Sequence, residues 1–144
     1  LLSHTPAKEA DAKRLGAHHF ILSSNPDELK KHHSKFDVVL NCISARHDYK
    51  TYLDLLALNG KMLIVGLPPE NPTLDPFAMI KNRRSIIGSM IGGTKETQEM
   101  LDFCAAHQIV SDIEVIPIQK IDEAYDRMIN GDVRYRFVID MKSL

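Results

Sequence analysis

Residues 36–66 read FDVVLNCISARHDYKTYLDLLALNGKMLIVG, and this stretch decides the fold. It begins with one apolar run, Phe36–Cys42, and ends with another, Lys61–Gly66. Between them, Tyr49–Leu58 carries apolar residues at helical spacing, and the pair Asn59-Gly60 is a typical helix stop. A strand, a helix and a second strand in this order predict a βαβ unit, in which the two strands are parallel.

The same alternation continues in both directions along the chain. Continuous apolar runs of this length are typical of strands that are covered on both faces, as in parallel sheets. Further strands are predicted at His19–Ser23, Ser85–Ile91, Ile113–Ile118 and Tyr135–Asp140, and further helices at Lys8–Leu15, Thr94–His107 and Ile121–Ile129. The sequence therefore predicts an α/β fold with a Rossmann-like, doubly wound, mainly parallel sheet flanked by helices. Leu1–Ser3 resembles the end of a strand, so we expect the first strand of the fold to lie upstream.

Composition narrows the possible functions. The chain has 144 residues, about one domain at roughly 100–200 residues per domain. Its 18 Lys and Arg against 19 Asp and Glu provide no broad basic field, so neither nucleic acid nor a membrane is an expected partner. Two cysteines are too few for a disulfide scaffold or a zinc cluster. A reducing compartment, the cytoplasm, is the simplest expectation.

The segment Ser3–Lys8, at a predicted strand end, has the residue types of a phosphate site. In dinucleotide-binding folds an acidic residue at this place accepts the ribose 2′-hydroxyl of NAD, whereas a 2′-phosphate requires donors and positive charge. Here the first acidic residue is Glu9. The hydroxyls of Ser3 and Thr5, the Lys8 ammonium and a donor from His4 would suit a phosphate. The same residues also fit an ordinary helix cap followed by a solvated lysine.

Several longer motifs resemble one enzyme family. They are Ser3–Ala17, Phe36-Asp37, Leu63–Pro68 (LIVGLP), Ile87–Asp102 (IGSMIGGTKETQEMLD), Ser111–Ile116 (SDIEVI) and Asp132–Asp140 (DVRYRFVID). Together they resemble the cofactor domain of zinc-dependent, medium-chain alcohol dehydrogenases, most of all the cinnamyl alcohol dehydrogenase branch. The resemblance implies an enzyme that interconverts alcohols and aldehydes by hydride transfer with NADP(H) and a catalytic zinc.

The resemblance also implies which residues bind NADP. The 2′-phosphate loop of the family falls on Ser3, His4, Thr5 and Lys8, although the family often has serine or threonine where this chain has His4. Cys42 replaces a threonine near the adenosine. Gly66 matches a glycine at which the backbone passes close to the cofactor. Ser89, Met90 and Ile91 match the segment whose backbone meets the nicotinamide carboxamide, and Arg134 matches a basic residue near the pyrophosphate.

Other parts of such an enzyme are not recognisable in this sequence. There is no G-x-G-x-x-G loop, which in the family binds the pyrophosphate after the first strand. The histidines and cysteines lack metal-ligand spacing, so no metal ligand and no catalytic residue are predicted. We expect residues 1–144 to be a partial NADP-binding domain, inactive alone, with the zinc and the catalytic domain outside this chain. The resemblance further implies a homodimer joined through the Ser85–Ile91 strand.

One alternative to this interpretation remains open. A stand-alone α/β nucleotide-binding or signalling module would have the same strand–helix alternation. A receiver-like module requires acidic residues at its early strand ends, and the corresponding positions here are Ser3, Ser23 and Asn41-Cys42.

Overall fold

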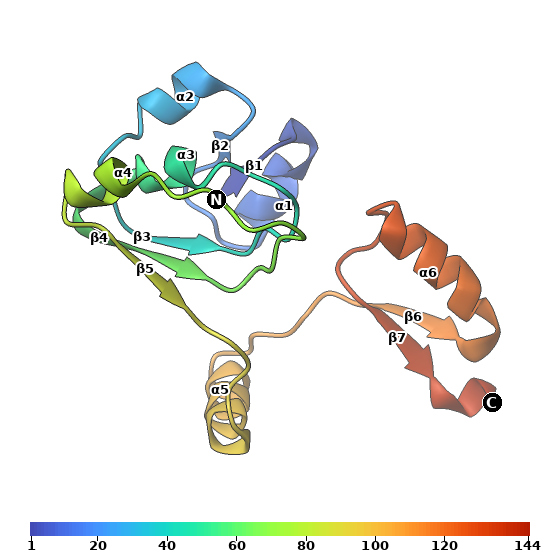
Figure 1. The fold of residues 1–144 in the computed structure, drawn as a ribbon. Coiled ribbons are helices and arrows are strands. Elements are labelled where there is room, and N and C mark those ends of the chain that lie inside the picture. The colour runs from blue at the N-terminus through green and yellow to red at the C-terminus, as the bar shows by residue number, and fades with distance from the viewer. The chain divides into compact units, whose positions relative to one another are not determined.

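The computed structural model describes residues 1–144 and divides them into two compact units, Leu1–Ile91 and Gly92–Leu144 (Figure 1). The elements of the first unit are β1 (Leu2–Ser3), α1 (Glu9–Arg14), β2 (Ile21–Leu22), α2 (Pro26–Lys30), β3 (Phe36–Asn41), α3 (Tyr49–Leu53), β4 (Leu56–Ile64), α4 (Pro76–Ile80) and β5 (Ser85–Gly88). Those of the second are α5 (Thr94–Ala106), β6 (Glu114–Pro117), α6 (Ile121–Ile129) and β7 (Phe137–Asp140). Short 3-10 helices occupy Pro6–Lys8, Ile118–Lys120 and Met141–Ser143.

All strand pairs are parallel, as the sequence predicted, and helices flank the sheets in a Rossmann-like arrangement. The strands form three sheets, β1–β2, β3–β4–β5 and β6–β7, where we expected one. In the largest sheet Val39 lies beside Met62, and Met62 lies beside Ile86. No strand of the chain pairs with the free edge of β1 or of β3, so the two sheets of the first unit stay separate.

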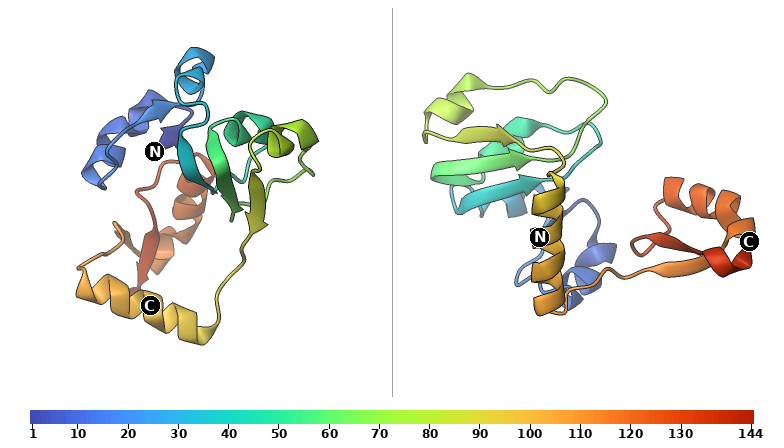
Figure 2. Two further views of the ribbon diagram at one scale, coloured as in Figure 1. Left: turned by 90° about the vertical axis from the view of Figure 1, so that its left-hand side faces the viewer. Right: turned by 90° about the horizontal axis from the view of Figure 1, so that it is seen from below.

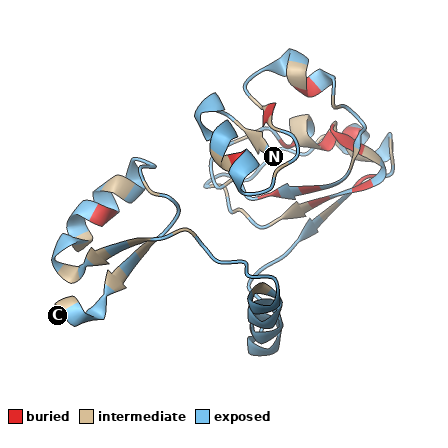
Figure 3. Ribbon diagram, turned by 180° about the vertical axis from the view of Figure 1, so that it is seen from behind, coloured by how far each residue is buried: buried red, intermediate tan, exposed pale blue.

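The main core lies on one face of the β3–β4–β5 sheet. Figure 1 shows α3 and α4 above this sheet, and their side chains Tyr49, Leu53 and Ala78 pack against Val39 and Met62. Burying such a side chain contributes about 1.5–3 kcal/mol. Most buried residues, red in Figure 3, belong to the first unit.

The opposite face of β3 is open within the first unit. Val38 and Leu40 alternate with Val39 along the strand, so they point to the other face, where 54% and 60% of their surfaces are exposed. Within the first unit, helices cover one face of β3, and no helix of the unit covers Val38 and Leu40 on the other. The two helices that pack on this sheet, α3 and α4, share one face.

The helix predicted over Tyr49–Leu58 ends five residues early, at Leu53. The backbone carbonyls that would continue the helix accept hydrogen bonds from another segment. The Asp54 carbonyl accepts from the Ser34 N–H, and the Leu55 carbonyl accepts from the Phe36 N–H. The carbonyl of Leu56 accepts from the Arg84 guanidinium at 2.9 Å. Tertiary hydrogen bonds and the burial of Leu55 and Leu56 therefore override the helical spacing.

A small second sheet holds the start of the chain. Leu2 pairs with Ile21 and Ser3 with Leu22. A separate apolar cluster of Ile21, Leu29 and Leu55 supports this sheet, with Leu2 packed against it. The end of β1, where the sequence predicted a phosphate loop, is thereby anchored to the first unit.

The second unit contains the β6–β7 sheet, with α6 along one face in the right-hand view of Figure 2. Arg127 of α6 pairs with Glu114 at 2.8 Å and lies 4.8 Å from the centre of the Phe137 ring. The predicted helix Ile121–Ile129 is confirmed residue for residue. The other helix, α5, ends at Ala106, one residue before its predicted end at His107; Gly93 is its N-cap, and the Glu96 carboxylate accepts from the Gly93 N–H at 2.9 Å. No helix is both long and apolar enough to cross a bilayer.

Candidate functional site

Three of the predicted site residues follow three neighbouring parallel strands. Cys42 comes directly after β3, Gly66 two residues after β4 and Ser89 directly after β5. The Gly66 N–H donates to the Asn41 carbonyl at 3.1 Å, and the Ser89 N–H donates to the Ile64 carbonyl at 3.0 Å. The structure therefore brings the three to one edge, the carboxyl edge, where ligands bind in open parallel sheets. Met90 and Ile91 follow Ser89 and are 92% and 94% exposed.

Gly66 lies directly on the backbone of the neighbouring loop. A Cβ at this position would come within 2.5 Å of the Ile43 carbonyl oxygen and 2.6 Å of the Cys42 carbonyl carbon. Glycine is thus required here by the chain itself, a reason that sequence reasoning did not supply. The contact between Gly66 and a cofactor stays a prediction.

Sequence reasoning missed Asn41, the buried amide at the end of β3. Only 3% of its surface is exposed. Its Oδ1 accepts from the Ile43 N–H at 3.1 Å, and its Nδ2 lies 2.8 Å from His47 Nε2. An amide that ends the apolar run VVLN is itself a sequence signal for a buried hydrogen-bonded group, but its partner depends on how the following loop folds.

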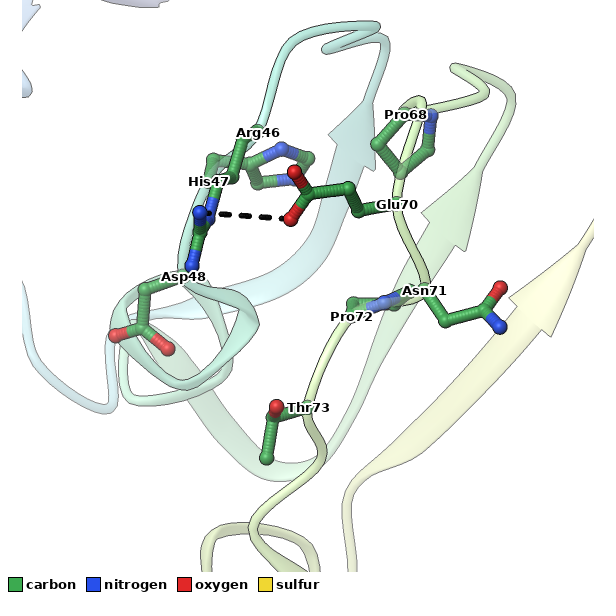
Figure 4. Close-up of a pocket in the computed structure, with 8 residues that line it drawn as sticks. All are labelled: Arg46, His47, Asp48, Pro68, Glu70, Asn71, Pro72 and Thr73. Atoms are coloured by element: carbon green, nitrogen blue, oxygen red, sulfur yellow. Dashed lines mark ion pairs between the residues drawn. The ribbon is translucent and has the colours of Figure 1, made fainter.

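The loops after β3 and β4 enclose a cavity of about 450 Å³ at this edge (Figure 4). Arg46, His47 and Asp48 line it from the first loop, and Pro68 and residues 70–73 line it from the second. Arg46 and Glu70 face each other across it at 3.4 Å, although both are largely exposed. The cavity offers charged groups of both signs, and Pro68 and Pro72 form part of its apolar lining.

Asp48 caps α3 and fixes the end of the first loop. Its carboxylate accepts from the backbone N–H groups of Lys50 and Thr51 and from the Thr51 hydroxyl. Partial burial raises the pKa of Asp48, but the hydrogen bonds from Thr51 and Lys50 outweigh it, so the pKa lies below its ordinary value. The Asp48 carboxylate at the end of this loop therefore stays ionised near neutral pH.

The second group of predicted residues, Ser3, His4, Thr5 and Lys8, lies at the end of β1. Thr5 caps the short 3-10 helix, because its hydroxyl accepts from the Ala7 N–H at 3.1 Å. The Ser3 hydroxyl donates to the Thr5 carbonyl at 3.2 Å. The hydroxyls therefore act as the helix cap that the sequence also allowed. Each hydroxyl can still rotate and use a remaining lone pair or its proton to bind a ligand.

Lys8 is the strongest candidate in this group for an anion. Its side chain is exposed and forms no ion pair, whereas the nearby carboxylate of Glu9 is neutralised by Lys13 at 2.7 Å. No carboxylate lies between β1 and Lys8. The turn thus presents one free ammonium and two hydroxyls, with an exposed His4 beside them, and this set suits a phosphate.

Arg134 belongs to the second unit. Its backbone N–H donates to the Glu114 carboxylate at 3.3 Å. The pKa of Glu114 lies below its ordinary value, mainly because Arg127 donates to this carboxylate, with a smaller contribution from the Arg134 N–H. No group of three His, Cys, Asp or Glu side chains anywhere in the chain is placed to hold a metal ion.

Comparisons with a family model and with known proteins point to the same family. Residues 1–106 match the family model described as zinc-binding dehydrogenase. The chain is 46% identical over its whole length to the probable formaldehyde dehydrogenase AdhA of Bacillus subtilis, of which it covers 41%. It is 51% identical, over 96% of its length, to the aldehyde reductase YahK of Escherichia coli, of which it covers 40%.

Solved structures agree with these relatives. A cinnamyl alcohol dehydrogenase from Sorghum bicolor matches 96% of the chain with a TM-score of 0.92 and 34% identity, and the chain covers 40% of it. The Helicobacter pylori CAD structure complexed with NADP(H) matches 98% of the chain with a TM-score of 0.83 and 39% identity, and again 40% of it is covered. The chain thus spans about 40% of the length of the relatives it matches.

Proposed function

The chain belongs to the zinc-binding dehydrogenase family, and on this premise we propose that it is the NADP(H)-binding portion of an alcohol dehydrogenase. The whole enzyme would interconvert small alcohols and aldehydes by hydride transfer. The portion here would be a partial cofactor domain, inactive alone, and would act in the cytoplasm, where its two free cysteines remain reduced.

The turn after β1 is the observation that carries this proposal. A carboxylate at this position would repel a 2′-phosphate and favour NAD, and here the first carboxylate, Glu9, is paired with Lys13. The free ammonium of Lys8 and the hydroxyls of Ser3 and Thr5 would bind the phosphate, with His4 adding a donor. The Helicobacter pylori relative complexed with NADP(H) supports the same cofactor.

The carboxyl edge of the β3–β4–β5 sheet would hold the rest of the cofactor. Gly66 and the Cys42–Ile43 backbone would form its floor, and backbone groups of Ser89–Ile91 would orient the nicotinamide amide. The cofactor supplies the hydride, so the role of these residues is to bind and orient it.

A catalytic zinc does not fit the residues of this chain, because they form no ligand cluster. In the proposal, the zinc belongs to a catalytic domain outside these 144 residues.

A second copy of the chain is the proposed protein partner. β5 is the outer strand of its sheet, so one of its edges is free to pair. Pairing of Ser85–Ile91 with its own copy would join two sheets edge to edge into a homodimer.

Kinetics on the protein in its natural full length tests this function. Alcohol oxidation and aldehyde reduction are measured with aliphatic and aryl substrates, using the phosphorylated and the non-phosphorylated nicotinamide cofactor in parallel. We expect turnover of at least one substrate pair, with a higher kcat/KM for NADPH than for NADH. Equal kcat/KM values for the two cofactors contradict the cofactor assignment, and no turnover with either contradicts the enzymatic one.

A further inference from the structure

The amide of Asn41 has one orientation in this structure. A backbone N–H can only donate, so the atom that faces the Ile43 N–H at 3.1 Å must be the oxygen of the amide. The amide nitrogen therefore points the other way and donates to His47 Nε2 at 2.8 Å. Since Asn41 is buried, reversing the amide would leave two donors facing each other without water to separate them.

This orientation fixes the protonation of His47. Its Nε2 accepts from Asn41 and so carries no proton. Its Nδ1 lies 2.8 Å from the Ala45 carbonyl oxygen, which can only accept, so Nδ1 carries the proton and donates. Both hydrogen bonds are satisfied only by the neutral ring with its proton on Nδ1.

The two residues connect the loops of the carboxyl edge. The Asn41 carbonyl accepts from the backbone N–H groups of Val65 and Gly66, at 3.0 and 3.1 Å. The Asn41 side chain holds Ile43, whose carbonyl is the atom closest to a Cβ built on Gly66. The ring of His47 supports the far side of the same loop, 4.9 Å from the ring of Tyr49 and 5.6 Å from that of Tyr52.

We propose that His47, as the neutral ring protonated on Nδ1, is a positioning residue that holds Asn41 and the Cys42–Ile43 loop in the shape on which Gly66 rests. This inference deepens the proposed function, on which it rests, because this loop and Gly66 form the proposed floor of the cofactor site. His47 touches neither cofactor nor substrate in this role and acts through Asn41.

Protonation of His47 would break this arrangement. The doubly protonated ring presents an N–H at Nε2 to the amide N–H of Asn41, so the hydrogen bond between them is lost. The charged groups near the ring are Arg46 and Asp48 on its own loop and Glu70 across the cavity, and the rings of Tyr49 and Tyr52 on α3 pack against it. Since protonation of the ring removes the hydrogen bond to Asn41, acidification should loosen the loop.

A first experiment requires no cofactor. The ring nitrogens of His47 are assigned by 15N NMR near neutral pH, with His33 as the reference, because His33 is exposed and its ring has no hydrogen-bond partner in the structure. We expect a proton on Nδ1 of His47 and none on Nε2. A ring with its proton on Nε2 overturns the inference.

A second experiment separates positioning from general stability. In His47→Gln the side-chain oxygen can replace Nε2 as an acceptor and cannot be protonated, whereas His47→Leu has no acceptor; His33→Gln is the matched control. Amide hydrogen exchange at Ile43 and Gly66 and NADPH affinity are measured near neutral and at mildly acidic pH on the full-length protein.

For His47→Leu we expect exchange at Ile43 to accelerate and NADPH affinity to fall, each by about tenfold, the size of one hydrogen bond. His47→Gln should resemble the wild type near neutral pH and, unlike the wild type and His33→Gln, should not loosen in acid. Wild-type exchange in His47→Leu, or acid loosening in His47→Gln equal to that of the wild type, overturns the inference. If NADPH binds to no variant while the exchange pattern holds, the proposed function fails and the positioning of the loop by His47 stands.

Discussion

The carboxyl edge of the β3–β4–β5 sheet and the turn after β1 are built in opposite ways. At the edge, the backbone of Gly66 packs so closely against that of Cys42 and Ile43 that no Cβ fits between them. The buried side chain of Asn41 holds Ile43 in this position through a hydrogen bond. In the turn, the exposed side chain of Lys8 would supply the charge of the proposed phosphate site, while Ser3 and Thr5 order the backbone beside it. The first region sets a shape and the second sets a charge, so substitutions should damage them differently.

The largest effect is expected from Arg84, which supports the packed region from the amino end of β5. Its side chain is 1% exposed, donates to the carbonyls of Leu56 and Ala78, and pairs with Asp54 at 3.2 Å. Arg84→Met leaves the two buried carbonyls without this donor, at about 1–3 kcal/mol for each unsatisfied group, and should lower the free energy of unfolding by about 3–5 kcal/mol.

Urea denaturation measures this loss, with Arg83→Met as the control. Arg83 is exposed and precedes Arg84 directly, so its substitution should cost less than about 0.5 kcal/mol. Equal losses in the two variants would show that the packed region does not depend on the buried guanidinium.

Gly66→Ala should have the next largest effect, because it tests the packed edge itself. The new Cβ meets the Ile43 carbonyl at 2.5 Å, so the loop must move, at a cost of about 1–3 kcal/mol. NADPH affinity should fall as well. At Gly88 a Cβ would have no heavy atom within 4 Å, so Gly88→Ala is the matched control, and unfolding and NADPH titrations are compared. A Gly66→Ala protein as stable as Gly88→Ala contradicts the packing.

The sequence predicts those features of this edge that depend on local patterns, and it misses those that depend on contacts between residues distant in the chain. The apolar runs predict β3 and its parallel partners, because strand periodicity is local. The early end of α3 was missed because carbonyl bonds of Asp54 and Leu55 to a distant segment decide it. Gly66 was predicted as a site residue, yet the reason it must be glycine lies in Ile43, a neighbour in space alone. His47 was not singled out among the histidines, since its partner Asn41 is identified only by the fold of the loop.

Lys8→Ala tests the exposed region and should leave the packed one intact. Losing one charged donor should weaken NADPH binding about tenfold and leave NADH affinity within about twofold, without a change in unfolding free energy. Isothermal titration with both cofactors measures this, with the exposed Lys31→Ala as the control. A parallel loss of both affinities would mean that Lys8 supports the fold and selects no phosphate.

The smallest effect is expected when acid protonates Asp54, which pairs with Lys50 and Arg84. Burial raises the pKa of Asp54, but hydrogen bonds and charges of Lys50 and Arg84 outweigh it and hold the pKa below its ordinary value. The ionised carboxylate therefore stabilises the fold above the pKa of the unfolded chain, and this contribution disappears as the pH falls through the lower, folded pKa.

The contribution should amount to less than about 1 kcal/mol, because the carboxylate is partly exposed. Unfolding free energies of the wild type and of Asp54→Asn are compared from neutral to acidic pH. The difference between the two should shrink in acid. A difference that stays constant across this range would remove Asp54 from the acid response.

The contrast between shape and charge is tested most directly by the affinities of the wild-type full-length protein for NADPH and NADH. The two cofactors share every group that the carboxyl edge would hold and differ only in the 2′-phosphate that the turn after β1 would bind. Equilibrium titration should give a lower Kd for NADPH, by about tenfold or more, for a charge-assisted contact to Lys8. Equal Kd values, or tighter binding of NADH, would contradict the account.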